Sequence, residues 1–318
     1  MNAVFERICK LSQYELKRYV TEQLKETHKK IVFEDGFVYA EGEFPVLLIA
    51  HLDTVHDKLP TSILYDVENG TMSSPNGIGG DDRCGVYMIL SIIKRYNCSV
   101  LFCEDEEHGL VGATKFIKSQ TAKRADCNYM IEFDRKGKND AVFYSCDNSD
   151  FEKFITEKFY KKAYGSFSDI SAVAPYIGRA AVNLSCGYYN PHTLKEYVNL
   201  EEMEQSIEYA CKILEKTTED DVFDYIEAKR HYYGGCNNNN YNYHYEESEC
   251  NYFGGDCDDD YGTYGYYIIE YIDGHGNPQW YDTFADTKEE AVGKFLMEHS
   301  MMRYADVIDV CVEYGLYT

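Results

Sequence analysis

The first 225 residues alternate between short apolar runs and segments with helical spacing. The apolar runs of strand length are 46–50, 99–103, 128–133, 141–145 and 180–184. The segments whose apolar residues recur every three or four positions are 83–96, 110–120, 150–160 and 200–214. Fully apolar strands are typical of sheets that are covered on both faces. The pattern predicts an α/β fold with a mixed, largely parallel sheet sandwiched by helices.

The beginning of the chain adds two elements to this pattern. Residues 5–26 predict a single first helix, because their apolar positions keep helical spacing throughout. Residues 31–42 predict a hairpin, because the pair Asp35-Gly36 between two strand-like runs is a strong signal for a tight turn. At the other end of this region, Asn199 followed by Glu202 predicts the start of the closing helix.

The composition changes after residue 225. Residues 226–265 are rich in Asn, Gly, Tyr and acidic residues and poor in aliphatic ones, so they predict a linker without a core of its own. Periodicity returns in residues 266–318, which predict a hairpin over 266–285, an amphipathic helix over 287–302 and a strand over 306–314. We expect a small C-terminal α+β (ββαβ) module, whose position suggests docking of a protein partner.

The charge of the chain excludes several classes of function. Its 318 residues include 31 Lys and Arg against 55 Asp and Glu, a formal net charge of −24. Such a charge opposes binding to nucleic-acid phosphates and to anionic membranes. The sequence has no apolar run of membrane-spanning length and no apolar stretch typical of a signal peptide near its start, so we expect a cytoplasmic protein. Its 12 Cys are scattered without a CxxC pair, which favours buried thiols over a disulfide framework.

Imidazoles and carboxylates cluster just beyond the predicted strands. They occur in the segments His51-Leu52-Asp53, Asp81-Asp82 after a Gly-rich turn, Glu104 to His108, Asp134, and His192. Ligands bind α/β sheets at the carboxyl ends of the strands, so five segments point to one place. A single charged residue at a strand end is most often a solvated loop residue, and the acidic run 104–107 could begin a helix. The joint occurrence of all five segments favours a site.

This set of side chains suits divalent metals of the zinc type. Imidazole and carboxylate bind zinc without any thiolate. One carboxylate can bridge two ions about 3.5–4 Å apart, which then act together on a carbonyl group. Such a site also needs a base that is not a ligand, and the adjacent Glu106 and Glu107 could divide these two roles.

The order of the motifs resembles the co-catalytic di-zinc exopeptidases, which include aminopeptidases, peptidase T-like tripeptidases, carboxypeptidases and deacylases. The resemblance covers about residues 45–215. The matching motifs are His51 to Val55, Gly80 to Gly85, Asp105 to Gly109, Asp134, and His192-Thr193 with Glu196. Each motif alone is weak, but five in the same order are specific.

The resemblance implies a role for each residue. Asp81 would bridge two divalent ions, with Zn²⁺ first and Co²⁺ or Mn²⁺ as alternatives. His51 and Asp134 would complete one site, and Glu107 and His192 the other. Glu132 lies close enough in sequence to compete with Asp134. Glu106 would be the base that activates water and later protonates the leaving amine. Asp53 would hold the His51 ring in the tautomer that a metal requires.

The sequence departs from part of this family. Many members insert a lid or dimerisation domain between the last two ligands, whereas only 58 residues separate Asp134 from His192. The expected activity is therefore that of a compact aminopeptidase acting on small peptides. Two alternatives remain open: an N-acyl amino acid deacylase using the same centre, and a non-catalytic binding protein that keeps the fold.

Three nearby features each allow two interpretations. Tyr188 or Tyr189 could donate to a developing oxyanion or could pack at the rim. Arg179 could bind a substrate carboxylate, as in a carboxypeptidase, or could be a surface residue. The Ser-Asp pair at 168–169 resembles an element of the same aminopeptidases, and either residue could instead cap the following helix.

Overall fold

The computed structural model describes residues 3–165, 167–228, 265–272, 278–285, 294–295 and 307–315. The chain divides into two compact units, Met1–Ala228 and Lys229–Thr318. The predicted linker lies outside the described residues from position 229 to 264 and stays a prediction.

An eight-stranded sheet forms the centre of the first unit. Its middle strands are parallel, in the order β6 (Cys98–Cys103), β3 (Phe44–His51), β7 (Tyr129–Arg135) and β10 (Ala181–Ser185). The antiparallel hairpin of β1 (Lys30–Glu34) and β2 (Phe37–Glu41) extends the sheet beyond β6. Strands β8 (Asp140–Val142) and β9 (Lys161–Ala163) extend it beyond β10. The predicted mixed, largely parallel sheet and its first hairpin are confirmed.

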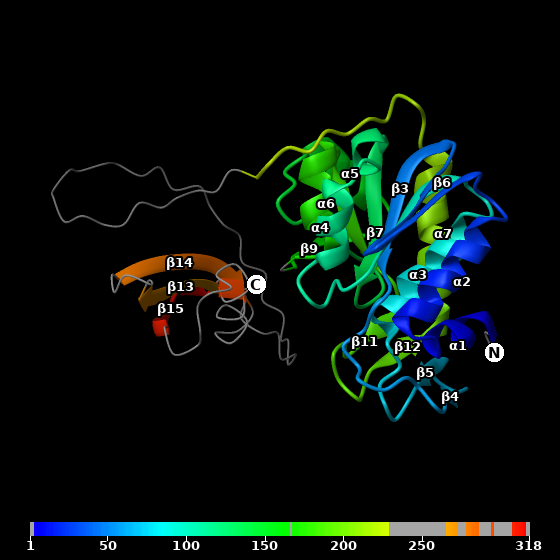
Figure 1. Ribbon diagram of the computed structural model, residues 1–318, viewed down its shortest axis with the longest axis horizontal. Helices are drawn as coiled ribbons and strands as arrows, with labels where there is room; N and C mark the ends of the chain where they lie inside the picture. The colour runs from blue at the N-terminus through cyan, green and yellow to red at the C-terminus, as the bar shows by residue number, and fades with distance from the viewer. Residues whose placement is uncertain are drawn as a thin grey trace. The chain divides into compact units, whose positions relative to one another are not determined.

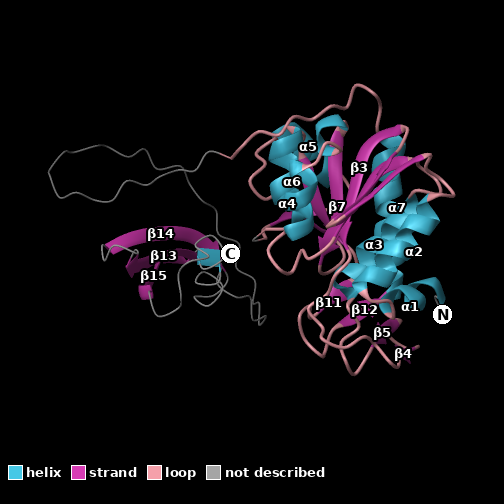
Figure 2. Ribbon diagram, viewed as in Figure 1, coloured by secondary structure: helices cyan, strands magenta, loops and turns pink. Residues whose placement is uncertain are grey.

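Helices cover both faces of this sheet (Figure 1, Figure 2). On one face, α3 (Gly80–Ile92) lies against β3 and β7, with α1 (Ala3–Cys9), α2 (Gln13–Leu24) and α7 (Leu200–Lys216) around it. On the other face lie α4 (Val111–Lys118) and α6 (Asp169–Ile177). The short helix α5 (Ser149–Thr156) and a 3-10 turn (Ala122–Arg124) complete the set.

Residues 46–50 of strand β3 are all apolar because both faces of the strand are buried there. Leu48 belongs to the core shared with α3, and Leu47 and Ile49 belong to the core under α4 and α6. Successive side chains of a strand point to opposite faces, and here both faces are buried.

Glycine allows α3 to lie directly on the sheet. A Cβ atom at Gly85 would overlap the carbonyl oxygen of Phe133 in β7. The helix therefore approaches the strand backbone more closely than any other residue would allow.

The prediction of a single helix over 5–26 is wrong. The chain forms two helices, α1 and α2, with a break at residues 10–12. Ser12 caps α2: its hydroxyl accepts from the Glu15 N–H, and the Glu15 carboxylate accepts from the Ser12 N–H. This reciprocal capping starts a new helix even though the apolar spacing continues across the break.

A second, four-stranded antiparallel sheet lies near the site and was not predicted. Its order is β11 (Tyr188–Tyr189), β12 (Tyr197–Asn199), β5 (Thr71–Ser73) and β4 (Leu64–Asp66). His192 lies in the hairpin between β11 and β12. Strands of two or three residues are too short to show alternation, which explains why the sequence pattern missed them.

The second unit contains a three-stranded antiparallel sheet of order β14 (Pro278–Ala285), β13 (Gly265–Ile272) and β15 (Val307–Gly315). The predicted hairpin and last strand are therefore present. The predicted helix over 287–302 lies outside the described residues except for the helical pair Lys294 and Phe295.

The described cysteines agree with the expectation of buried thiols. The eight cysteines whose side chains are described, all in the first unit, are free and buried, as predicted. In the described part of the chain, every helix is too short or too polar to cross a membrane.

Candidate metal centre

The ends of the central strands bring the predicted site residues together. His51 is the last residue of β3, Asp134 lies near the end of β7, and Glu106 and Glu107 follow β6. Asp81 comes from the first turn of α3. The hairpin between β11 and β12 adds His192, whose backbone has a left-handed φ of 61°.

Asp81 lies between the two histidines. Its Oδ1 is 3.1 Å from Nε2 of His51, and its Oδ2 is 3.3 Å from Nε2 of His192. The two oxygens of one carboxylate thus face two different imidazoles, which is the geometry that a bridging ligand requires.

One further carboxylate completes each side. Asp134 Oδ1 lies 3.6 Å from Nε2 of His51, and Glu107 Oε1 lies 3.0 Å from Nε2 of His192. The sets His51, Asp81, Asp134 and Asp81, Glu107, His192 each offer ligand atoms within 4.8 Å of one another. Among the described residues, Glu132 belongs to no such group, and it is fully buried within the sheet.

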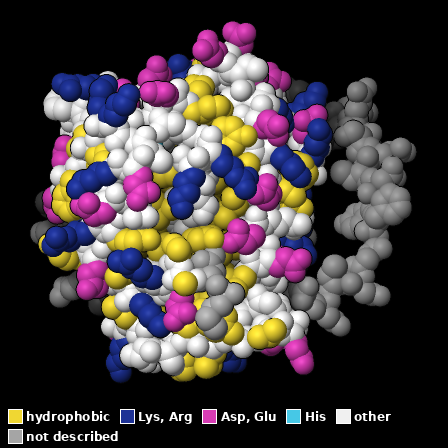
Figure 3. All heavy atoms as spheres, turned by 90° about the vertical axis from the view of Figure 1, so that its right-hand side faces the viewer, with side chains coloured by type: hydrophobic (Ala, Val, Ile, Leu, Met, Phe, Trp, Pro, Cys, Tyr) yellow, Lys and Arg dark blue, Asp and Glu magenta, His cyan; other side chains and the backbone are white. Residues whose placement is uncertain are grey.

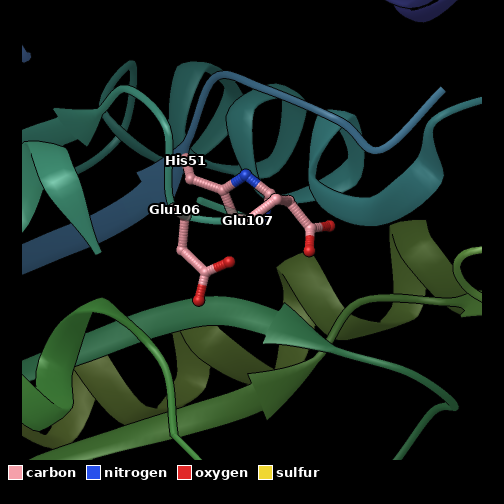
Figure 4. A group of neighbouring side chains, drawn as sticks. All are labelled: His51, Glu106 and Glu107. Atoms are coloured by element: carbon pink, nitrogen blue, oxygen red, sulfur yellow. The ribbon is translucent and has the colours of Figure 1, made fainter. Parts of the chain in front are cut away.

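Glu106 and Glu107 lie beside the His51 ring and form a third such group with it (Figure 4). Both side chains come from the loop after β6. Their adjacent positions bring one more carboxylate to the centre than the two sets require.

The contacts of the Glu107 carboxylate fit a bound metal ion better than a network of hydrogen bonds. Oε1 of Glu107 is buried and accepts no hydrogen bond from any described residue, although the His192 nitrogen is close to it. A buried oxygen without a partner is costly unless a cation binds it. The donors are imidazole nitrogens and carboxylate oxygens, which suit zinc, cobalt and manganese.

Asp53 orients the His51 ring. Its Oδ1 lies 3.1 Å from Nδ1 of His51, which favours a proton on Nδ1 and leaves Nε2, 3.1 Å from Asp81, as the nitrogen that a metal would use. The same carboxylate accepts the backbone N–H groups of Glu106 and Glu107, each at 3.0 Å. Burial alone would raise the pKa of Asp53, but its bond to His51 and these two N–H groups outweigh burial and lower it to about 2.

The metal-free centre shifts the pKa of both histidines upward. Burial would lower the pKa of His51, but the carboxylates of Asp134, Asp53 and Asp81 outweigh burial and raise it. His192 is half exposed, and its contacts with Asp81 and Glu107 raise its pKa to about 11. Without a cation, the two imidazoles therefore hold protons that compensate for the surrounding carboxylates.

Two carboxylates of the centre hold protons more tightly than usual. Burial, followed by the charge of Asp81, raises the pKa of Asp134 to about 6. Burial raises the pKa of Glu106 to about 10, with Asp134, Asp169 and Glu107 adding to the effect. A raised pKa of this kind is typical of a carboxyl group that exchanges a proton during catalysis.

Two hydroxyls donate hydrogen bonds to Asp134. Ser168, at the N-cap position of α6, donates to Asp134 Oδ2 at 2.8 Å. Tyr188 is buried and donates to Asp134 Oδ1 at 3.3 Å, and Tyr189 donates to Glu202 at 2.5 Å. Both phenols already have acceptors, so an oxyanion role is not supported.

Arg179 lies away from the centre. It precedes β10, at the end of the sheet opposite the candidate ligands, where it donates to the Cys127 carbonyl and pairs with Asp224. It is therefore not placed to bind a substrate carboxylate at the centre.

Comparison with known proteins supports the same interpretation. Residues 38–181 match the model of peptidase family M28. The M28 match contains His51, Asp81, Glu106, Glu107 and Asp134 but ends before His192. It confirms the resemblance to the co-catalytic zinc exopeptidases. No curated protein matches the chain in sequence.

Solved structures with the same fold include two peptidases. Aminopeptidase PepT from Bacillus cereus ATCC 10987 is 14% identical with a TM-score of 0.51, over 66% of this chain and 96% of its own. A tripeptidase from Staphylococcus aureus subsp. aureus Mu50 is 12% identical with a TM-score of 0.52, over 66% of this chain and 95% of its own. At these identities the likeness shows the fold alone.

Proposed function

We propose that the unit Met1–Ala228 hydrolyses amide bonds as a two-zinc, aminopeptidase-like exopeptidase of small peptides. The observation that carries this proposal is the Asp81 carboxylate, whose two oxygens face two different histidines. The M28 match supports peptide hydrolysis as the reaction class.

Five side chains would hold the ions. Asp81 would be shared, His51 and Asp134 would bind on the buried side, and Glu107 and His192 on the exposed side. When bound, the ions supply Lewis acidity towards the scissile carbonyl oxygen. The bond from Asp53 keeps the proton of His51 on Nδ1, so that Nε2 is free for a ligand role.

Glu106 would move the proton. Its carboxyl group is buried beside Glu107, and it is not needed as a ligand in either set. It would accept a proton from the attacking water and deliver it to the leaving amine. Cations beside it favour its ionised form, which opposes the effect of burial on its pKa.

The short connection between Asp134 and His192 supports a site that is not covered by an additional domain and that accepts small substrates. The described residues of this interval form β8, α5, β9, α6, β10 and β11, all elements of the domain itself. They leave no inserted domain over the centre, and the side chain of His192 is 54% exposed. Both features favour a site that is open to a short peptide.

Elemental analysis of the purified protein tests the metal centre. We expect about two zinc ions per chain, both lost in Asp81→Ala, because this residue would serve both positions. Two ions retained in Asp81→Ala would contradict the bridging role.

Paired peptide substrates test the reaction. We expect the protein to cleave a peptide with a free amino group but not the N-acetylated form of the same peptide. Cleavage of the acetylated form alone would instead indicate the deacylase, and cleavage of neither by zinc-loaded protein would favour a non-catalytic binding protein.

A further inference from the structure

A buried glutamate connects the His192 segment to the loop of Asp81. Glu196 lies four residues after His192 and is only 1% exposed. Its Oε1 accepts the backbone N–H of Asp81 at 3.0 Å, and its Oε2 accepts that of Gly79 at 2.8 Å. A carboxylate that accepts two neighbouring N–H groups fixes the orientation of that stretch of backbone.

The same carboxylate also contacts the segment that follows β3. Nε2 of His56 lies 2.8 Å from Oε2 of Glu196, and His56 comes five residues after His51. Glu196 therefore contacts or belongs to three segments, each of which carries one of the candidate ligands His51, Asp81 and His192.

The Gly-rich turn before Asp81 packs closely against His56 and against the hairpin that carries Glu196. A Cβ atom at Gly77 would overlap the His56 ring. At Gly80 it would lie 2.7 Å from Val198 and 2.8 Å from Tyr188, in the two strands that flank the Glu196 hairpin. Because real Cβ atoms do not come so close, glycine lets this turn reach Glu196.

We propose that Glu196, supported by His56, is a positioning residue that directs the Asp81 carboxylate to both metal positions. This inference rests on the proposed two-metal centre. Glu196 belongs to none of the described groups that could hold an ion, and both of its oxygens accept from N–H donors. It acts by fixing the Asp81 backbone, so that one oxygen faces His51 and the other faces His192.

The substitution Glu196→Gln is the most specific test. A glutamine has one carbonyl oxygen and one NH₂ group, so it cannot accept from all three donors, and at least one N–H would face another donor. We expect the variant to bind zinc about 10- to 100-fold more weakly, the usual effect of losing a residue that orients a ligand.

Three readouts separate positioning from a general loss of stability. Zinc affinity is measured by chelator competition, the geometry of the centre by the visible spectrum of the cobalt-loaded protein, and amide exchange in residues 77–83 by mass spectrometry on metal-free protein. The matched control is Glu202→Gln, which removes a carboxylate bonded to Tyr189 at 2.5 Å in the same region but contacts no candidate ligand.

The expected result is weaker zinc binding, an altered cobalt spectrum and faster amide exchange in Glu196→Gln, with zinc affinity and cobalt spectrum unchanged in Glu202→Gln. Zinc affinity and a cobalt spectrum equal to those of the parent would overturn the inference while leaving the metal centre intact. A parent protein that binds no metal would overturn the proposed function itself.

If Glu196→Gln does not fold, His56→Ala decides the question. It removes one donor and leaves the bonds to Gly79 and Asp81 in place, so we expect a smaller loss of zinc affinity with a shifted cobalt spectrum. An unchanged spectrum in a folded His56→Ala protein would count against the inference.

Discussion

Glu106 and Glu107 are neighbours in sequence but have different surroundings. Glu107 Oε1 faces the half-exposed His192 at 3.0 Å, whereas Glu106 is buried on the inner side of the loop. Burial and the nearby acidic groups raise the pKa of Glu106 to about 10 in the metal-free protein. The two identical side chains thus differ in where they point (Figure 4).

Glu106→Gln should separate these roles. The amide keeps the shape of the side chain but cannot accept a proton, so we expect peptide hydrolysis to fall by about 10²–10⁴-fold while two zinc ions remain bound. Glu107→Gln is the matched comparison and should weaken zinc binding instead. Steady-state kinetics and elemental analysis measure the two effects, and a fully active Glu106→Gln enzyme would show that another group is the base.

Zinc affinity should increase with pH. The surrounding carboxylates raise the pKa of His51 and that of His192, the latter to about 11, so both rings favour their protonated forms when no metal is bound. Zinc binds only neutral imidazole, so each ring must release its proton on binding. Below about pH 6, Asp134 also becomes protonated, which weakens binding further.

Calorimetry in two buffers of different ionisation enthalpy measures these protons. We expect net proton release near pH 7 and tighter zinc binding at pH 8 than at pH 6. Affinity that does not change over this range would contradict the ligand roles of the two histidines.

The convergence of the candidate ligands could be predicted from the sequence, but the residues that support them mostly could not. His51, Asp81 and His192 were recognised because imidazoles and carboxylates recur in five segments beyond the apolar runs. Tyr188 is one of 31 tyrosines in the chain, and nothing in its local sequence indicates that its hydroxyl holds Asp134. Such supporting contacts depend on how distant segments pack, which local patterns do not record.

At the scale of elements, strand length decided what the sequence could predict. The central strands have five to eight mostly apolar residues, and all four were recognised. The strands of the small sheet have two or three residues, including the pair that carries the His192 hairpin, and these were missed. The break between α1 and α2 was missed because the apolar spacing continues across it, although capping at Ser12 starts a new helix.

Gly85→Ala should destabilise the contact between α3 and the sheet. The added methyl group would overlap the Phe133 carbonyl, so α3 and β7 would have to separate. We expect a loss of about 1–3 kcal/mol in the free energy of unfolding, typical of an overpacked core, measured by urea denaturation. Ser91→Ala, on a half-buried position of the same helix, should change it by less than about 0.5 kcal/mol. Equal stability of the two variants would mean that the helix can shift without cost.

At the scale of the whole molecule, the chain combines a strong net charge with a mixed surface. The formal charge is −24, yet the face that carries α1 and α2 shows basic and acidic side chains interspersed with apolar ones (Figure 3). Charges of both signs on one face oppose long-range attraction of a polyanion or polycation to that face.

Removal of residues 229–318 should leave the metal centre intact. All candidate ligands and both sheets that position them lie within Met1–Ala228, which is a compact unit. A chain ending at Ala228 should therefore bind two zinc ions and unfold cooperatively, as measured by elemental analysis and thermal denaturation. Loss of zinc in the folded, shortened chain would show that the second unit contributes to the centre.

The unequal exposure of the two histidines has a kinetic consequence. The His51 side chain is 1% exposed, whereas that of His192 is 54% exposed. A chelator could reach an ion on the His192 side directly. It could reach an ion beside His51 only after that part of the structure opens. Release into a colorimetric chelator should therefore occur in two phases, and a single phase for both ions would contradict this asymmetry. A briefly chelated sample would then be a uniform one-ion species, into which a spectroscopically visible metal could be introduced at the open position alone.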